Sequence, residues 1–320
     1  MKFTLTCAAA ALGLALASPA GAAADSLDWP ARQITWLVGF VPGGTADVLT
    51  RIAAQELARN TGLNVVVENR PGASGAIALQ LLARSKAADG YLLTVPGPII
   101  YPTPQPEVGA ALAPVVLMAQ GPMVVVGPAK DARADLQAVL ADARKRPEAW
   151  SYGSSGTGTS QHLAGELLNQ YAGTRIVHVP YKGGGQAVAD VSGGQIPLAI
   201  LGSSTVLPQI KSGALKGYAV TTTYRLDSLP EVPTVAQSGF KDFDASQWFS
   251  VAASNTIAAR QLDQMNAALR AAMDTPQFKT AVANAGMVAG GGSREDLLKF
   301  IQTDRAKWRK LIDSGAVKLD

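Results

Sequence analysis

The sequence predicts an α/β fold built in two lobes, and three observations support this prediction. Short apolar runs of strand character alternate with helical patterns along most of the chain, which is typical of parallel sheets covered by helices. The chain has 320 residues, and chains of this length tend to divide into two domains. A strand, a proline, a glycine pair and a helix follow one another twice, at Val41–Asp47 and at Val179–Asp190. One copy in each half predicts two lobes that face each other.

The first 24 residues are predicted to be a secretory signal peptide. Lys2 provides a short positive start, Leu5–Ala17 is apolar, and small residues end in an A-x-A site at Ala22–Ala24. We therefore expect cleavage before Asp25 and an exported, periplasmic mature protein. Cys7 lies inside the apolar run and lacks the residues that precede a lipidated cysteine, so no lipid anchor is expected. No later apolar run reaches the roughly 18–20 residues needed to span a bilayer.

Composition excludes several classes of function. The formal charge of +4 becomes +3 when Lys2 is removed, and no run of five or six basic residues occurs, so nucleic acid is not an expected partner. Only two histidines, His162 and His178, are present, and they are not close in sequence. A histidine-based metal site and a cofactor are therefore not expected. About 295 mature residues are enough to bury roughly three quarters of the unfolded surface without a disulfide.

The first half of the mature chain predicts three strands and two helices before an irregular segment. The first helix carries Val48, Leu49, Ile52 and Leu57, which we expect on one buried face. The segment from Pro96 to Pro114 contains six prolines and is expected to be irregular. The other predicted elements are the strand Ile34–Phe40, a buried strand Asn64–Glu68, the helix Ala76–Lys86 and the strand Tyr91–Val95.

Two apolar runs, Val115–Ala119 and Met123–Gly127, are predicted to carry the chain from one lobe to the other. The strand Lys216–Thr222 is predicted to carry it back. Lobe 1 is then expected to comprise residues 25–120 and 220–320, and lobe 2 residues 121–219. Hinge strands are expected near Met118–Met123 and Leu215–Thr222.

The second lobe is predicted to alternate helices and strands, and three helices close the chain. Ser293 is a predicted N-cap of the last helix, with Asp296 at its third position. The predicted elements are the helix Asp135–Lys145, the strand Trp150–Tyr152, the helix Ser160–Tyr171, the strand Arg175–Val179, a helix ending at Asp190, the strand Ile196–Ile200, the helix Ser203–Lys211 and the late strand Trp248–Ser254.

The two glycine loops are candidate anion sites. A strand that turns through glycines into a helix leaves the first helical N–H groups unpaired, and the positive end of the helix dipole favours a carboxylate or phosphate there. Gly43 and Gly44 have no side chains to keep a ligand from the backbone. Lys182 is the only charged residue inside a glycine loop, where it is either a ligand group or a solvated side chain. An ordinary strand–helix turn is the simpler alternative for either loop alone.

Nucleotide motifs fail on spacing. Gly153–Ser160 reads G-x-x-G-x-G, the reverse of the dinucleotide fingerprint, and neither a P-loop nor a G-x-S-x-G nucleophile elbow occurs. The hydroxyl residues of this loop remain candidate donors to a carboxylate. His162 and Glu166 at i and i+4 suggest a metal pair or a general base, but with no third ligand in view a helix-surface hydrogen bond is favoured. The alternative of an exported hydrolase that uses the Ser/Thr-rich loop with His162 stays open.

Taken together, a series of motifs resembles one family over almost all of the mature chain. The sequence is similar to the tripartite tricarboxylate transporter receptors, extracytoplasmic solute-binding proteins also called Bug proteins. The motifs are VPGGTAD, VVVENRPGASG, DGYLL, YGSSGTGTSQHLAGE, HVPYKGGGQAVAD and LPEVPTVAQSGF, preceded by the export signal.

The resemblance implies a type II periplasmic-binding-protein fold, with two α/β lobes, a two-stranded hinge and a ligand cleft. It also implies a monomeric receptor that binds a small organic carboxylate and delivers it to membrane subunits of a tripartite transporter, with no enzymatic activity. A ligand sensor that docks on a signalling protein is a further alternative. By resemblance, the ligand-binding positions are Phe40, Pro42, Gly43, Gly44, Thr45, Asp47, Ser154, Ser155, Thr159, His162, Tyr181, Lys182 and Gly183.

The sequence departs from the family pattern at two places. The segment from Pro96 to Pro114 is shorter than usual and rich in proline, so we expect a reshaped cleft wall there. The first loop reads Phe-Val-Pro-Gly-Gly where Phe-Pro-Pro-Gly-Gly is more usual; these departures leave the predicted carboxylate site in place and bear on the identity of the rest of the ligand.

Overall fold

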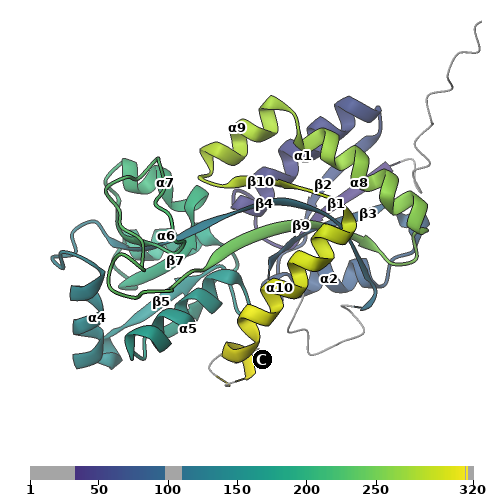
Figure 1. The fold of residues 1–320 in the computed structure, drawn as a ribbon. Helices are drawn as coiled ribbons and strands as arrows, with labels where there is room; N and C mark the ends of the chain where they lie inside the picture. The colour runs from purple at the N-terminus through teal and green to yellow at the C-terminus, as the bar shows by residue number, and fades with distance from the viewer. Residues whose placement is uncertain (1–32, 98–109, 314, 316–320) are drawn as a thin grey trace, which may run out of the picture.

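A computed structural model describes residues 33–97, 110–313 and 315 of the protein. The signal peptide predicted at residues 1–24 and most of the proline-rich segment lie outside these residues. The described chain forms a mixed α/β structure of two lobes side by side, with long strands running between them (Figure 1). In the described part of the chain, no helix has both the length and the apolar character needed to cross a membrane.

Helices and strands alternate as the sequence predicts. The strands are β1 (Gln33–Val38), β2 (Asn64–Asn69), β3 (Tyr91–Pro96), β4 (Leu112–Pro128), β5 (Ser151–Ser154), β6 (Val177–Pro180), β7 (Leu198–Gly202), β8 (Leu215–Val220), β9 (Ser246–Ser254) and β10 (Val288–Gly291). The α-helices are α1 (Thr45–Thr61), α2 (Ala76–Ala83), α4 (Leu136–Lys145), α5 (Ser160–Ala172), α6 (Gly184–Ser192), α7 (Ser203–Lys211), α8 (Ala259–Met273), α9 (Pro276–Asn284) and α10 (Arg294–Asp313). Short 3₁₀ turns occupy Ala73–Gly75, Ala87–Asp89 and Pro147–Ala149.

The strands form a curled sheet in the order β2-β1-β3-β9-β4-β7-β5-β6, and β8 and β10 also pair with β4. The pairs β1–β2, β1–β3, β5–β6 and β5–β7 are parallel, as the strand–helix alternation predicts. Because the carboxyl ends of parallel strands meet at one edge, the loops after β1, β5, β6 and β7 are where a ligand site is expected.

One strand, β4, passes through both lobes. Its first part pairs with β9, and its second part, Met123–Pro128, pairs with β7 and β8. The two apolar runs predicted at Val115–Ala119 and Met123–Gly127 therefore form one continuous strand, because Gly121 and Pro122 between them pair with Gln247 and Ser246 of β9. The segment Pro96–Pro114 was expected to be irregular, but its last residues, Leu112–Pro114, belong to β4.

The strand predicted to carry the chain back, β8, lies inside the second lobe instead. It pairs with Val124–Pro128 of β4, and the strand beside β4 at the junction is β9. Residues 221–245 then pack against the second lobe, where Leu229, Val235 and Phe243 join its core. This packing differs from the expected assignment of residues 220–320 to lobe 1, whereas the boundary expected at 120 stays a prediction.

Each lobe has its own apolar core. The first core gathers side chains from β1, β3, α1 and α8, including Trp36 and Leu269. In the second lobe one cluster contains Trp150 and Tyr152, and another contains Val206 and Val220. Helix α10 crosses in front of the sheet, and its Trp308 is buried in the second lobe (Figure 1). At the start of α10, Asp296 N–H donates to Ser293 Oγ at 3.1 Å and Ser293 N–H donates back to Asp296 Oδ2, which confirms the predicted cap.

Two predictions of burial are wrong for reasons of position. The strand predicted to be buried is β2, which lies at the end of the sheet with β1 as its neighbour and leaves Val66 44% exposed. Val48 was expected on the buried face of α1 but is also 44% exposed, whereas Leu49 and Leu57 are buried. The residue that turns inward in its place is Thr50, whose hydroxyl bonds Thr94 Oγ1 at 2.6 Å.

Candidate functional site

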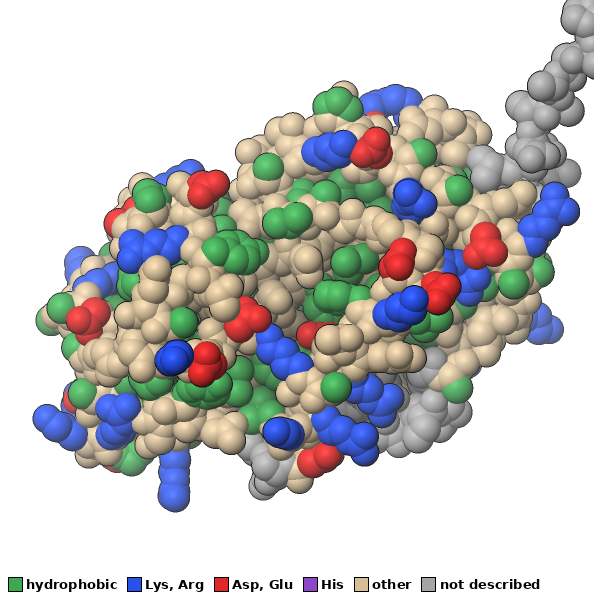
Figure 2. Space-filling model, in the orientation of Figure 1, with side chains coloured by type: hydrophobic (Ala, Val, Ile, Leu, Met, Phe, Trp, Pro, Cys, Tyr) green, Lys and Arg blue, Asp and Glu red, His purple; other side chains and the backbone are tan. Residues whose placement is uncertain are grey.

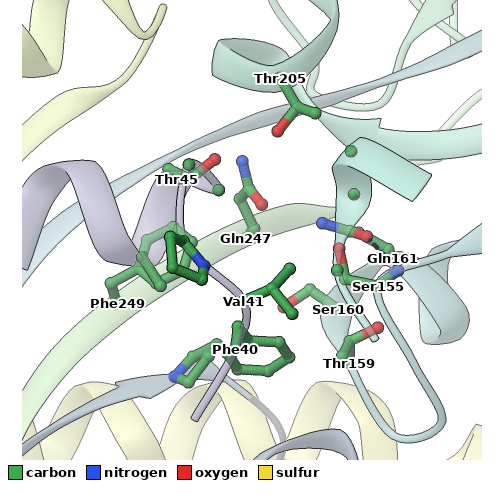
Figure 3. A pocket seen from close by; sticks show the side chains of 18 residues that line it. Phe40, Val41, Thr45, Ser155, Thr159, Ser160, Gln161, Thr205, Gln247 and Phe249 are labelled. Atoms are coloured by element: carbon green, nitrogen blue, oxygen red, sulfur yellow. Dashed lines mark hydrogen bonds between the residues drawn. The ribbon is translucent and has the colours of Figure 1, made fainter. Parts of the chain in front are cut away.

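A cavity of about 300 Å³ lies between the two lobes, beyond the ends of the parallel strands (Figure 3). The loop between β1 and α1 lines one side, the starts of α5, α6 and α7 line the other, and β9 lies at the base. None of the described residues that line it is charged. They are Phe40, Val41, Pro42, Gly43, Gly44, Thr45, Ala46, Pro96, Ser155, Thr159, Ser160, Gln161, Gly183, Gly184, Gly185, Thr205, Gln247 and Phe249.

Four helices present their N-terminal turns to this cavity. Thr45 begins α1, Ser160 begins α5, Gly184 begins α6, and Thr205 lies in the first turn of α7. The first N–H groups of each helix have no partner within the helix, and each dipole adds partial positive charge. An anion in this cavity is therefore favoured by backbone groups alone, without a cationic side chain.

The first glycine loop is shaped by Asp47, which lies outside the cavity. Asp47 Oδ2 accepts from Gly43 N–H at 3.0 Å, and Oδ1 accepts from Asn69 Nδ2 at 2.9 Å. Arg51 pairs with the same carboxylate. Burial by itself raises the pKa of Asp47, but the hydrogen bonds from Arg51, Gly43 and Asn69 outweigh it and hold the pKa below its usual value. Asp47 thus occupies the Gly43 amide that was expected to face the ligand.

The predicted ligand positions in the loop after β5 and at the start of α5 divide between the cavity and the layer of side chains behind it. Ser155 and Thr159 line the cavity, and Thr159 caps α5 by accepting from His162 N–H at 3.3 Å. Ser154 is fully buried, with its Oγ 2.6 Å from His178 Nε2.

His162 is also buried, and it is stacked on His178 with ring centroids 3.8 Å apart. His162 Nδ1 accepts from Gly158 N–H at 3.1 Å, so this nitrogen carries no proton. Burial lowers the pKa of His162 to about 4. Burial, with a smaller contribution from His162, lowers the pKa of His178 to about 3. The favoured surface hydrogen bond between His162 and Glu166 is wrong, because His162 points inward and Glu166 accepts from Tyr152 Oη at 2.7 Å.

Of the predicted ligand positions Tyr181, Lys182 and Gly183, only Gly183 lines the cavity. Tyr181 Oη donates to Asp190 Oδ2 at 2.6 Å, and Lys182 is exposed to solvent. Among the described residues, no group of three His, Cys, Asp or Glu side chains is placed to hold a metal ion.

Several lining residues were not predicted as site residues. Gln247 and Phe249 come from β9, Thr205 from α7, and Gln161 from α5 (Figure 3). The one sequence signal for Gln247 as a site residue is that it is a polar residue at the start of an apolar strand.

The cavity joins polar groups to an apolar wall. Phe40, Val41 and Phe249 supply the wall, while the hydroxyls of Ser155 and Thr205 lie on the second-lobe side (Figure 3). Such a lining suits a small ligand that carries an anionic group on an apolar body. Gln247 Nε2 donates to Pro122 O at 3.3 Å, which holds its amide at the base of the cavity.

Comparison with known proteins gives one consistent result. Residues 49–317 match the family described as tripartite tricarboxylate transporter family receptor. Protein BugT of Bordetella pertussis is 32% identical over 319 residues, which cover 97% of this chain and 98% of that protein. An R. palustris protein solved with adipate superposes with a TM-score of 0.83 and 29% identity, over 91% of this chain and 99% of that one. The periplasmic binding protein BugD gives a TM-score of 0.81 and 25% identity, over 90% and 98% of the two chains.

Proposed function

Because this chain belongs to the tripartite tricarboxylate transporter receptor family, as its motifs predict, we propose that it is a periplasmic receptor for a small organic carboxylate. It binds the acid between its two lobes and delivers it to the membrane subunits of a transporter of that type. The observation that carries the proposal is the convergence of four helix N-termini on a cavity lined by uncharged described residues. The adipate found with the R. palustris relative supports a carboxylate as the ligand class.

In this proposal one carboxylate lies between the starts of α1 and α6, near the backbone of Thr45 and Gly184. The hydroxyls of Ser155 and Thr205 add donors, and the rest of the acid lies against Phe40 and Phe249. Asp47, Ser154, His162, Tyr181 and Lys182 were expected to bind the ligand but lie outside the cavity lining; the first four support the loops from behind.

We propose that the protein acts by binding alone. A hydrolase that used the Ser/Thr-rich loop with His162 would need that ring free to take a proton from a hydroxyl. His162 Nδ1 instead accepts the Gly158 amide, and the buried Ser154 contacts His178. These contacts favour a structural role for the histidines.

A thermal shift experiment tests the ligand class. We expect a mono- or dicarboxylate such as adipate to stabilise the mature protein, and its amide analogue to leave the melting temperature unchanged. At a hundred times Kd the stabilisation is about 2.7 kcal/mol. For a chain of this size this corresponds to about 5–10 °C. Native mass spectrometry of freshly purified protein would identify a retained acid, and a broad panel of organic acids without any shift would contradict the proposal.

A further inference from the structure

Three consecutive hydroxyl residues begin α7, and each faces a different part of the protein. Ser203 is fully buried, and its Oγ donates to the carbonyl oxygen of Ala285 at 2.5 Å. Ser204 Oγ shares a hydrogen bond with Thr45 Oγ1. Thr205 lines the cavity. The first turn of α7 therefore makes two hydrogen bonds in addition to its contact with the site.

Both hydrogen bonds join the two lobes. Val206 of α7 packs in the core of the second lobe, whereas Ala285 packs in the first core. Thr45 begins α1, the helix that follows the first glycine loop. The Ser203 bond is made inside packed protein. The Ser204 bond is made at the cleft, because its partner lines the cavity.

The Ser204 contact depends on how the lobes sit and not on a bound molecule. Ser204 is not among the residues that line the cavity, and both atoms of its hydrogen bond belong to the protein. The two glycine loops approach each other in the same arrangement, since a Cβ added to Gly183 would lie 2.7 Å from Val41 Cγ2. The lobes are thus in direct side-chain contact around the cavity.

We propose that Thr45 and Ser204 form a latch that stabilises the closed lobes independently of the ligand. The role of this latch in ligand binding rests on the proposed function, whereas the contact itself is a property of the fold. A contact present only in the closed form raises the population of that form, and the apparent affinity rises in proportion to the population that is competent to bind. Ser204 is therefore a positioning residue, and its loss weakens every ligand by the same factor. One hydrogen bond corresponds to a factor of about three to ten.

The first test measures the separation of the lobes in the absence of ligand. Spin labels on Gln55→Cys in α1 and Lys145→Cys in α4 report this distance, and Cys7 in the predicted signal peptide is the only native cysteine. We expect Ser204→Ala to lower the ratio of closed to open molecules about threefold to tenfold, with or without adipate. Ser212→Ala is the matched control, because Ser212 is an exposed hydroxyl residue at the other end of α7. Distance distributions that are identical in Ser204→Ala and wild type, both free and with adipate, overturn the latch.

The second test separates a latch from a ligand contact. Calorimetry with adipate and glutarate is expected to show the same loss of affinity for both acids in Ser204→Ala, carried by faster dissociation. Thr205→Val, which changes the cavity wall, is expected to alter the ratio between the two acids. A changed ratio in Ser204→Ala would overturn the latch and make Ser204 a ligand contact. If neither acid nor any other carboxylate binds, the proposed function fails, while the ligand-free distances still decide the latch.

Discussion

Asp47 and Asn69 control the first glycine loop without facing the cavity. Asn69 Nδ2 donates to Phe40 O at 3.0 Å and to Asp47 Oδ1 at 2.9 Å, and its Oδ1 accepts from Arg51 at 2.7 Å. The side chain thus ties the end of β2 to both ends of the loop. Because backbone groups need a fixed geometry to bind a ligand, residues of this kind affect affinity without contact.

Replacing Asn69 with Ala tests this role. We expect carboxylate affinity to fall about tenfold and the free energy of unfolding to fall by about 1 kcal/mol, since three hydrogen bonds lose their partner. Calorimetry and urea denaturation measure the two effects. Asn64→Ala at the other end of β2 is the control, because Asn64 bonds Gln33 at an exposed site. Equal affinity in the two variants would exclude a positioning role for Asn69.

Gly44 allows a direct test of whether the first glycine loop is part of the ligand site. Gly44 has φ −79°, which any residue adopts, and a Cβ added there would meet no protein atom within 4 Å. Gly44→Val is therefore expected to fold normally, without strain in the turn, and to place its methyl groups in the ligand's path. We expect affinity to fall at least tenfold, about 1.4 kcal/mol. Unchanged binding by calorimetry in a variant with a wild-type melting temperature would remove the first loop from the site.

At the scale of elements, the strands β5 and β6 and the helix α5 enclose a layer of titratable side chains, His162 and His178, behind the loop that follows β5. The stacked His162 and His178 are neutral in the folded protein, with pKa values of about 4 and about 3, against about 6.5 in the unfolded chain. Between pH 6.5 and these values the unfolded state binds more protons, so stability rises with pH. The stabilisation is therefore complete above pH 6.5 and is lost as the pH falls towards 3.

This layer predicts acid-sensitive stability. We expect the free energy of unfolding to fall below pH 6.5, by up to about 1.4 kcal/mol per pH unit for each histidine. Glu166 acts in the opposite direction, because burial raises its pKa. His178→Phe keeps a ring in the stack and is expected to reduce the slope by about half, measured by urea denaturation at pH 7, 5.5 and 4.5. The same slope in variant and wild type would show that the histidines do not cause it.

At the scale of the whole molecule, the lobes meet closely around the cavity, and Figure 2 shows them as one continuous surface from the side of α10. The two glycine loops approach each other at Val41 and Gly183, where an added Cβ on Gly183 would lie 2.7 Å from Val41 Cγ2. Gly183 has φ 164°, an extended conformation open to any residue, so its missing side chain matters for space and not for the backbone. An added methyl group there acts as a wedge between the lobes.

Gly183→Ala tests whether the protein must close to bind. We expect affinity for adipate to fall about tenfold or more, because an overpacked contact opposes closure. Small-angle scattering should show a larger radius of gyration at saturation than in the wild type. Val41→Ala in the same chain removes the clashing methyl group and should restore most of the affinity, while Val41→Ala alone is the control. If the second substitution rescues nothing, the wedge explanation is wrong.

Sequence patterns predict most of the helices and strands, and the family, of this protein. Apolar periodicity, Gly and Pro are local signals, so they predict α7 at Ser203–Lys211 and the cap at Ser293, and both predictions are confirmed. The two glycine loops were recognised for the same reason. The motif series, read as a resemblance, named the family and the periplasmic-binding-protein fold that the comparisons support.

Which residues reach the cavity depends on the packing of the two lobes. Gln247 and Thr205 come from segments outside both glycine loops, and they line the cavity only because β9 and α7 both border it in the folded protein. Asp47 and His162 lie within the predicted motifs but point into networks of their own, because buried polar groups must find hydrogen-bond partners. A local pattern sets where a helix begins. Which side chains meet across a cleft depends on how the two lobes pack, and that is a sum over contacts between residues distant in the chain.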